Sequence, residues 1–376
     1  MTESADGAQK ARRSRAATIY DVARRAGVSH QTVSRLLGGF EGIRPETRAK
    51  VEKALRELDY RPNFAARSLT IGRSYRIGAL THEIDKLGPS RIIQGAAAAA
   101  RRAGYVLDIV TLDMADENAI AQSLDLIRQQ DLAGVLVLAS TDEMIGAFRK
   151  SRFSVPVHLS IDGEGRDEPT MQPLTLAELE LLVDLLWRDG HRRFAHIAGP
   201  SNSPAARNRE SAYKQALACR GVRSLCTLRG DWSAEAGYRA ASSLPRDVTA
   251  VIIANDQMAL GALLWLKEAG VMVPADVSVA GIDDIPESAY FSPPLTTVRL
   301  DFVAQGAIAV GKLLTMIGED ADVPTLMPRP QLVVRASTGA APDDLDRTPR
   351  GTLRSGRAAS NSCPSTRCRP RTPSAR

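Results

Sequence analysis

The 376-residue chain has only four cysteines, and no uncharged apolar run approaches the ~20 residues that a membrane-spanning helix requires. So few thiols in a chain of this length argue against a disulfide-stabilised scaffold, because such scaffolds are small and dense in cysteine. The first fifteen residues are polar and charged and lack the apolar core of a secretory signal. We therefore expect a soluble, cytoplasmic protein of two or three domains that does not enter a membrane.

Signatures of catalysis are also missing. The sequence contains no Ser–His–Asp signature, no phosphate-binding loop and no cluster of metal-ligating side chains. Cys363 and Cys368 have no second pair and no histidine nearby, so free thiols are a better interpretation than a zinc site. Adjacent carboxylates such as Asp283 and Asp284 are usually structural when they lie in a turn. We expect no catalytic residue, no metal and no cofactor, and a sugar-binding enzyme is a remote alternative.

Charge is unevenly distributed, although the formal net charge is only +6. Residues 1–76 contain 16 basic and 8 acidic side chains, residues 77–341 contain 25 and 32, and residues 342–376 contain 8 and 3. A basic head on a mildly acidic body suggests a module that binds a polyanion, joined to a separate domain. The arm of residues 1–16 is polar and the tail of residues 341–376 has few large apolar side chains, so both are predicted to be flexible or disordered.

The basic head is typical of a helix-turn-helix domain, which we place at residues 17–62. Ala23 is small where two helices would touch, Gly27 permits the positive φ of a tight turn, and Val33 would plug the second helix against the first. Ser29 can cap this second helix. The spacing predicts that the helix beginning there lies in the major groove of DNA.

Side chains able to contact DNA fall at the start of this second helix and one turn further along. Gln31 can form two hydrogen bonds with adenine, and Arg35 can form two with guanine. Short hydroxyl side chains suit phosphates, as does the phenol of Tyr20. A small helical domain with incidental Arg and Gln explains the combined motif and charge less well. The predicted DNA-binding residues of this domain are Thr18, Tyr20, Ser29, His30, Gln31, Thr32, Ser34 and Arg35.

From Tyr75 onward, short apolar runs alternate with longer helical stretches. This alternation predicts parallel sheets covered by helices, and its length fits two similar lobes better than one sheet. The strand candidates are Tyr75–Leu80, Val106–Thr111, Gly134–Ala139, Val157–Ile161, Phe194–Ala198, Ala250–Ala254 and Val277–Ile282. The helix candidates are Ser90–Ala103, Glu117–Gln130, Ala177–Arg188, Arg207–Arg220, Ala234–Ser242 and Gln257–Ala269.

Several motifs occur in a fixed order along the chain. They are Thr18–Arg35, Tyr60–Leu69, Gly190–Pro200, Gly230–Ala234, Ala254–Ala262, and Pro293–Thr297 leading to Asp301 and Phe302. Together they resemble the lactose-repressor/galactose-repressor family of bacterial transcription regulators, and the last three are most similar to its lactose-repressor members. The resemblance implies an all-α helix-turn-helix headpiece with a hinge helix, followed by an α/β two-lobed effector domain similar to periplasmic binding proteins.

The resemblance also implies a hinge helix and linker at residues 63–74, ordered on the operator. Asn63, Ala66 and Leu69 would then contact DNA, with Leu69 as an apolar wedge that kinks the duplex from the minor groove. Judged from its residues alone, the segment could be a simple linker, because so short a helix is marginal by itself. Arg44 stands where the family has a Ser or Thr cap before Pro45, which predicts a weak helix cap.

In the family, a small molecule binds between the lobes. The indole of Trp232 would stack on the apolar face of a pyranose, and Phe302 would form an apolar wall. Polar side chains at predicted strand ends match positions that bond ligand hydroxyls. The implied effector-binding residues are Lys86, Asp162, Arg209, Trp232, Asn255, Asp283 and Phe302. The implied lobes are discontinuous: lobe 1 at about 75–172 and 299–327, and lobe 2 at about 173–298 and 328–340.

These features predict a homodimeric repressor of sugar-utilisation genes, released from a palindromic operator by a small sugar, with a galactoside as the first candidate. Lys86, Ala205 and Leu300 depart from the pocket pattern of the lactose-repressor members, and Lys86 could admit a more polar or acidic sugar. A purine corepressor is the alternative within the same class. The tail has no apolar heptads that could assemble a tetramer, so a dimer is expected.

Overall fold

The computed structural model describes residues 17–37, 40, 42–60, 73–112, 117–161, 172–320, 324 and 326–343. Predictions for the arm of residues 1–16, the hinge residues Asn63, Ala66 and Leu69, the site residue Asp162 and the tail beyond residue 343 lie outside this description. Among the described residues, one compact unit takes in those up to 161 together with 301–328. The other takes in 172–300 together with 329–343.

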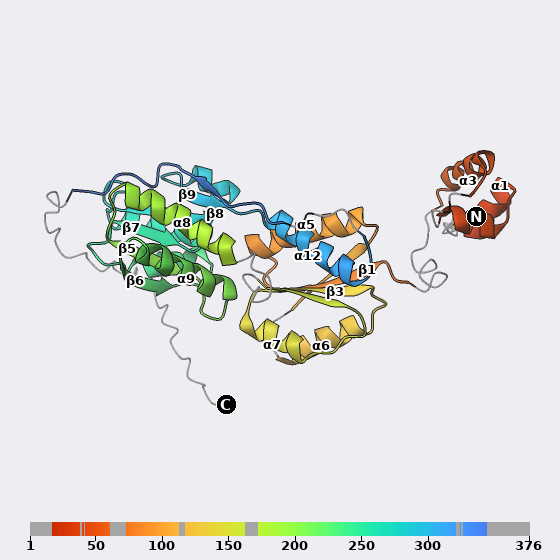
Figure 1. Cartoon of the computed structure of the whole chain (residues 1–376), viewed down its shortest axis with the longest axis horizontal. Coiled ribbons are helices and arrows are strands. Elements are labelled where there is room, and N and C mark those ends of the chain that lie inside the picture. Colours follow the sequence, from red (N-terminus) through yellow and green to blue (C-terminus); the bar gives the residue numbers. More distant parts are fainter. Residues whose placement is uncertain are drawn as a thin grey trace, which may run out of the picture. The chain divides into compact units, whose positions relative to one another are not determined.

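Three helices form the headpiece: α1 (Ile19–Ala26), α2 (His30–Leu37) and α3 (Pro45–Glu57). Figure 1 shows them gathered around one another, and their shared core consists of Val22, Ala23, Val33, Val51 and Ala54. Gly27 ends α1 at a φ of 68°, which a glycine adopts without steric cost. Arg44 makes no side-chain cap at the start of α3, so the weak cap predicted from the sequence is confirmed.

The sheet-containing part of the first unit, here called lobe 1, is a four-stranded parallel sheet in the order β2-β1-β3-β4. Its strands are β1 (Arg76–Thr81), β2 (Val106–Thr111), β3 (Gly134–Ala139) and β4 (Val157–Ile161). Helices α5 (Leu87–Arg102) and α12 (Phe302–Met316) cover one face, and α6 (Glu117–Arg128) and α7 (Asp142–Lys150) cover the other (Figure 1). Because both faces are covered, every residue of β3 is buried.

The second unit, here called lobe 2, holds a six-stranded sheet in the order β10-β9-β8-β7-β5-β6. Its strands are β5 (Phe194–Ala198), β6 (Ser224–Arg229), β7 (Ala250–Ile253), β8 (Ser278–Asp283), β9 (Thr296–Arg299) and β10 (Gln331–Val333). The pairs are parallel except that β10 runs antiparallel to β9. The predicted parallel sheets are confirmed, with one antiparallel strand added at an edge.

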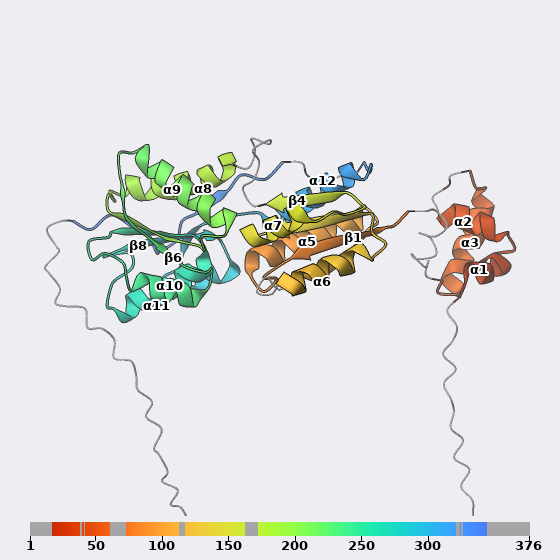
Figure 2. The same cartoon turned by 90° about the horizontal axis from the view of Figure 1, so that it is seen from below.

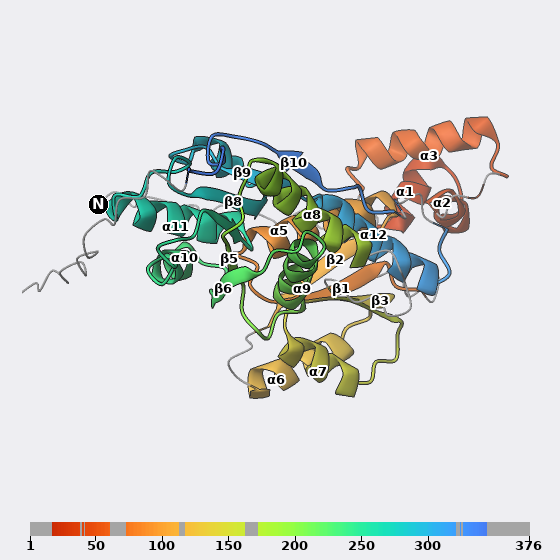
Figure 3. The ribbon, with the colours of Figure 1, turned by 60° about the vertical axis from the view of Figure 1, so that its left-hand side comes forward.

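Four helices cover the lobe 2 sheet, two on each face. They are α8 (Gln172–Arg188) and α9 (Pro204–Ala218) on one face, and α10 (Ala234–Ala241) and α11 (Asp256–Glu268) on the other (Figures 2 and 3). Loops leave the carboxyl ends of the parallel strands at one edge of this sheet, which is where open α/β sheets bind ligands. None of the helices seen in the described residues is long and apolar enough to cross a membrane.

Candidate functional site

Hydroxyl side chains predicted to contact DNA also form hydrogen bonds within the headpiece, and they differ in exposure. Ser29 caps α2, because its Oγ accepts a hydrogen bond from the Thr32 amide at 3.1 Å. Its Oγ also lies 2.9 Å from Thr32 Oγ1. Thr18 caps α1, where its hydroxyl donates to Asp21 Oδ2 at 2.6 Å and the Asp21 amide donates back to Thr18 Oγ1. Thr18, Thr32 and Ser34 are half-buried, whereas Ser29 is exposed.

The larger predicted DNA contacts are all on the surface of the headpiece. His30, Gln31 and Arg35 are exposed on α2. Tyr20 is 61% exposed, and its ring lies 5.1 Å from that of His30. The guanidinium of Arg35 lies 5.8 Å from the centre of the Phe40 ring. Helix α2 therefore presents an aromatic and an amide side chain in its first turn and a guanidinium one turn further along, which suits contacts with base edges and phosphates.

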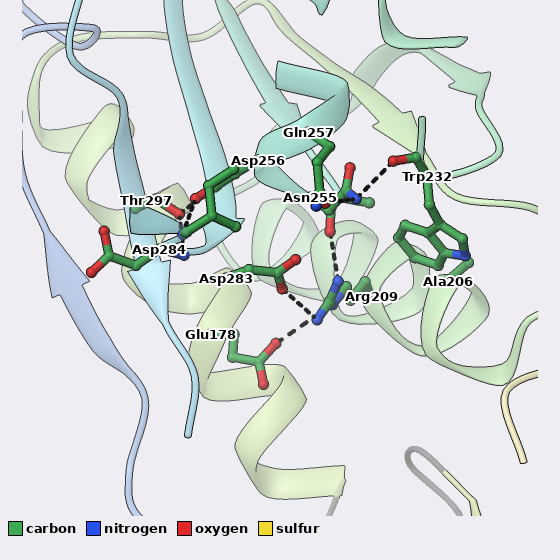
Figure 4. Close-up of polar contacts among 12 residues, drawn as sticks. Glu178, Ala206, Arg209, Trp232, Asn255, Asp256, Gln257, Asp283, Asp284 and Thr297 are labelled. Atoms are coloured by element: carbon green, nitrogen blue, oxygen red, sulfur yellow. Dashed lines mark hydrogen bonds and ion pairs between the residues drawn. The ribbon is translucent and has the colours of Figure 1, made fainter. Parts of the chain in front are cut away.

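In lobe 2, Arg209 is the centre of a buried polar cluster (Figure 4). It lies on α9 and is 6% exposed. Its Nη1 donates to the carbonyl of Ala254 at 2.6 Å, and its Nη2 donates to Asp283 Oδ1 at 3.3 Å. Its Nε lies 3.8 Å from Glu178 Oε2. One guanidinium thus contacts three elements: the carboxylate on α8, the carbonyl at the end of β7 and the carboxylate at the end of β8.

Glu178 was not among the site residues predicted from the sequence. This glutamate lies on α8, one turn before Leu182 of the lobe 2 core, and is buried. Its position in line with the apolar face of a predicted helix was the available signal. Charged side chains are seldom buried without a partner, so a glutamate at such a position indicates a buried polar contact.

Trp232 lies in the turn between β6 and α10, with its ring against Gly199 and beside Ala206 (Figure 4). A Cβ atom on Gly199 would come within 2.4 Å of the indole Cη2, so a side chain at position 199 would require the ring to move. The guanidinium carbon of Arg209 is 5.8 Å from the ring centre. The indole and the buried cluster therefore adjoin at the same edge of the sheet.

Asn255 connects the Trp232 turn to α11. Its Oδ1 caps α11 by accepting from the Met258 amide at 3.0 Å. Its Nδ2 donates to the carbonyl of Trp232 at 3.0 Å and to Gln257 Oε1 at 2.9 Å. In this structure Asn255 thus positions the tryptophan turn.

The neighbouring Asp256 is completely buried and ties three segments of lobe 2 together. It accepts hydrogen bonds from Ser288 Oγ at 2.6 Å, the Ile285 amide at 3.1 Å and Thr297 Oγ1 at 2.7 Å. Burial raises the pKa of its carboxyl from 3.8 to about 6, although the hydrogen bonds from Ser288 and Thr297 act in the opposite direction.

Three residues of this region have left-handed backbone conformations that are costly for side chains with a Cβ. The φ angles are 73° at Trp232, 117° at Asp283 and 52° at Asp284. The described chain has only two other such non-glycine residues, Asp59 and Glu83. Strained backbone of this kind concentrates at functional sites, because the surrounding contacts must hold it in place.

Two of the expected effector residues belong to lobe 1. Lys86 precedes the first turn of α5, with its Nζ 3.8 Å from Asp85 Oδ2. Phe302 is the first residue of α12, and a Cβ on Gly88 would lie 3.7 Å from its ring. The structure thus brings Phe302 next to the turn that carries Lys86. Arg209, Trp232, Asn255 and Asp283 adjoin in lobe 2.

The histidines of lobe 2 are buried and belong to its core. His196 is fully buried, with Nδ1 2.8 Å from the Ile252 carbonyl and its ring 4.7 Å from that of Tyr213. Burial lowers the pKa of His196 from 6.5 to about 4. Across the part of the chain that the structure describes, no group of three or more His, Cys, Asp or Glu side chains is placed to hold a metal ion.

Comparisons with known proteins identify two domains. A model of the bacterial regulatory proteins of the lacI family matches residues 18–63, and a model of the periplasmic binding protein-like domain matches residues 183–338. The lactose operon repressor of Escherichia coli strain K12 is 32% identical over 340 residues, covering 89% of this chain and 93% of that protein. The HTH-type transcriptional repressor CytR of the same strain is 33% identical over 335 residues, covering 87% and 98%.

Among solved structures, the Lac repressor dimer bound to operator and the anti-inducer ONPF has a TM-score of 0.72 at 31% identity, covering 87% of this chain and 100% of that chain. These relatives are repressors, and they share both the helix-turn-helix headpiece and the two-lobed domain over most of their length. The predicted fold class and family are confirmed. The chain belongs to the lacI family of bacterial regulatory proteins.

Proposed function

We propose that this repressor binds a palindromic operator as a homodimer and that a small sugar, with a galactoside as the first candidate, releases it. The observation that carries the sugar assignment is the indole of Trp232 beside the buried Arg209–Asp283 pair. An aromatic face next to hydrogen-bonding groups suits a pyranose, which has an apolar C–H face and a rim of hydroxyls. Sugar binding therefore fits the geometry of lobe 2 better than a catalytic role does.

In this proposal α2 enters the major groove of each operator half-site. Arg35 and Gln31 contact base edges, while Ser29, Thr32, Ser34 and Tyr20 contact phosphates. The exposure of Tyr20, Ser29, Gln31 and Arg35 supports these roles. The hinge residues Asn63, Ala66 and Leu69 act in the minor groove.

An apolar surface on α11 supports the homodimer. Leu260 and Leu264 are one helical turn apart, and they are 43% and 50% exposed. Two large aliphatic side chains on one helix face favour burial against a second copy.

The DNA assignment is tested with Arg35→Ala. Losing a bidentate contact with guanine should reduce binding to the specific operator by about 1–3 kcal/mol, while binding to unrelated DNA changes little. Arg56→Ala is a matched control, since Arg56 is an exposed arginine on α3 outside the predicted groove contacts. Normal operator binding by the Arg35 variant would show that the proposed register of α2 is wrong.

The effector assignment is tested by following tryptophan fluorescence while the protein is titrated with sugars and, separately, with purines. A sugar should change the tryptophan emission and reduce the affinity of the protein for operator DNA. The variant Trp232→Ala should still bind operator DNA, but sugar should no longer reduce its affinity for that DNA. A response to purines alone, with operator binding strengthened, would replace the sugar proposal by the corepressor alternative.

A further inference from the structure

Arg209, a residue of the proposed effector site, has a second carboxylate beside its guanidinium. This carboxylate belongs to Glu178. Its side chain is 10% exposed and that of Asp283 is 8% exposed. Both face Arg209, Glu178 from α8 and Asp283 from the end of β8 (Figure 4). Removing a carboxylate from water is costly, and here two carboxylates share one guanidinium.

The guanidinium is held in a defined orientation. Nη1 is bonded to the Ala254 carbonyl, which fixes the plane of the group, while Nη2 faces Asp283 and Nε faces Glu178. The two carboxylates therefore approach neighbouring nitrogens of one guanidinium (Figure 4), and the Trp232 ring lies 5.8 Å from the guanidinium carbon. A ligand stacked on Trp232 would therefore lie next to a guanidinium whose charge is opposed by two carboxylates, one from α8 and one from the end of β8.

Carboxylates accept hydrogen bonds and donate none when ionised. A pair of them suits a ligand with neighbouring donors, such as vicinal hydroxyls or a hydroxyl beside an ammonium group. The same pair repels a ligand carboxylate or phosphate, and like-charge repulsion of this kind is a common source of specificity. A cluster with this charge would bind neutral sugars and sugar acids with different affinities.

We infer that Glu178 is a specificity-determining residue of the effector site, which together with Asp283 selects a neutral sugar or an amino sugar and rejects sugar acids. The inference rests on the proposed sugar-responsive function. It favours a neutral or amino sugar over the acidic sugar that Lys86 alone suggests.

Isothermal titration of the full-length protein tests this inference with galactose, galactosamine and galacturonate, and with the matching glucose series. The wild type should bind the neutral or amino member of the responding series at least about 10-fold more tightly than the acid, as expected for one unfavourable charge contact. Glu178→Gln keeps the shape and removes the charge. It should weaken neutral-sugar binding by about 10-fold and reduce discrimination against the acid by a similar factor.

Glu180→Gln is the matched control, because Glu180 is an exposed carboxylate two residues along the same helix. It should leave both affinity and discrimination unchanged. A structural role for Glu178 predicts a different result, in which the variant binds all sugars less tightly by the same factor and the preference for neutral sugars persists. That result would overturn the inference.

The wild-type measurement decides the question even where Glu178→Gln does not fold. Binding of galacturonate or glucuronate as tight as that of the matching neutral sugar would overturn the inference and leave the sugar function intact. Binding of adenosine or another purine with no response to any sugar would instead overturn the proposed function, and the inference with it. The two failures are thus distinguishable.

Discussion

Gly199 determines where the Trp232 side chain can lie. The indole occupies the space that a side chain at position 199 would need, with only 2.4 Å between Cη2 and an added Cβ. The left-handed backbone of Trp232 and the hydrogen bond from Asn255 to its carbonyl restrict how the turn can respond.

We therefore predict that Gly199→Ala displaces the indole and weakens effector binding by about 1–3 kcal/mol, the usual cost of overpacking a close contact. Because the variant keeps Trp232, weaker effector binding would result from the altered position of the indole ring and not from its absence. Titration followed by fluorescence measures the affinity, and Gly146→Ala is the control because a Cβ on Gly146 meets no atom within 4 Å. Wild-type affinity in Gly199→Ala would mean that the ring position is unimportant for binding.

Individual site residues were predictable where a motif contained them, as for Trp232 and Asn255, or where they matched a family position near a predicted strand end, as for Arg209 and Asp283. Arg209, Trp232, Asn255 and Asp283 were identified from the sequence, and the structure brings them to one edge of the lobe 2 sheet, while their roles in binding stay predictions. Glu178 was missed because its proximity to Arg209 depends on how α8 packs on the sheet, which no local pattern specifies.

At the scale of elements, pairs of helices approach each other through glycines. A Cβ on Gly95 of α5 would lie 2.0 Å from the Val303 carbonyl oxygen of α12, and one on Gly306 would lie 1.9 Å from that of Ile92. Helices α10 and α11 make a similar close crossing through Gly237 and Gly261. Both lobes thus contain a helix pair whose backbones touch.

Gly95→Ala should destabilise lobe 1, because the methyl group would collide with backbone that cannot rotate away. We expect a loss of at least about 1–3 kcal/mol in the free energy of unfolding, measured by hydrogen exchange of β1 and β3 amides. Gly146→Ala, in the interior of α7 with open space around it, should instead stabilise its helix by up to about 1 kcal/mol. A Gly95 variant as stable as the wild type would show that the two helices can separate freely.

Most strands and helices were predictable from alternating apolar runs, but helices α7 and α12, strands β6, β9 and β10 and the short 3-10 helix Pro286–Tyr290 were not among the candidates. Helix α12 is almost uniformly apolar, because α5 packs on one side and the sheet on the other, so it shows no amphipathic period. Strand β6 is an edge strand with half-buried residues, and β10 has three residues. Strand β9 begins with two buried threonines that are satisfied by distant side chains.

At the scale of the whole molecule, two buried groups in lobe 2 should give opposite pH dependences to stability. The pKa of Asp256 is raised from 3.8 to about 6, so the folded state binds its proton more tightly, and this contribution to stability is lost as pH rises from about 4 to 6. The pKa of His196 is lowered from 6.5 to about 4, so its contribution is present above pH 6.5 and is lost as pH falls toward 4.

Each shift corresponds to about 3 kcal/mol, at about 1.4 kcal/mol per pKa unit, so the two contributions should largely cancel in the wild type. Asp256→Asn should expose the histidine contribution, making lobe 2 more stable as pH rises from about 4 to 6.5. His196→Asn, whose amide nitrogen can still donate to the Ile252 carbonyl, should give the reverse slope.

Denaturant unfolding followed by tryptophan fluorescence measures these slopes, because Trp187, Trp232 and Trp265 are the three tryptophans of the chain and all lie in lobe 2. Asp247→Asn is the control, since Asp247 is exposed in the same lobe and its loss should leave the pH profile of the wild type unchanged. If the Asp256 and His196 variants gave slopes of the same sign, the opposed titration of these two groups would be refuted. Opposite slopes would mean that two buried groups of lobe 2, one in the core and one beside the proposed effector site, make opposed contributions that offset each other in the wild type.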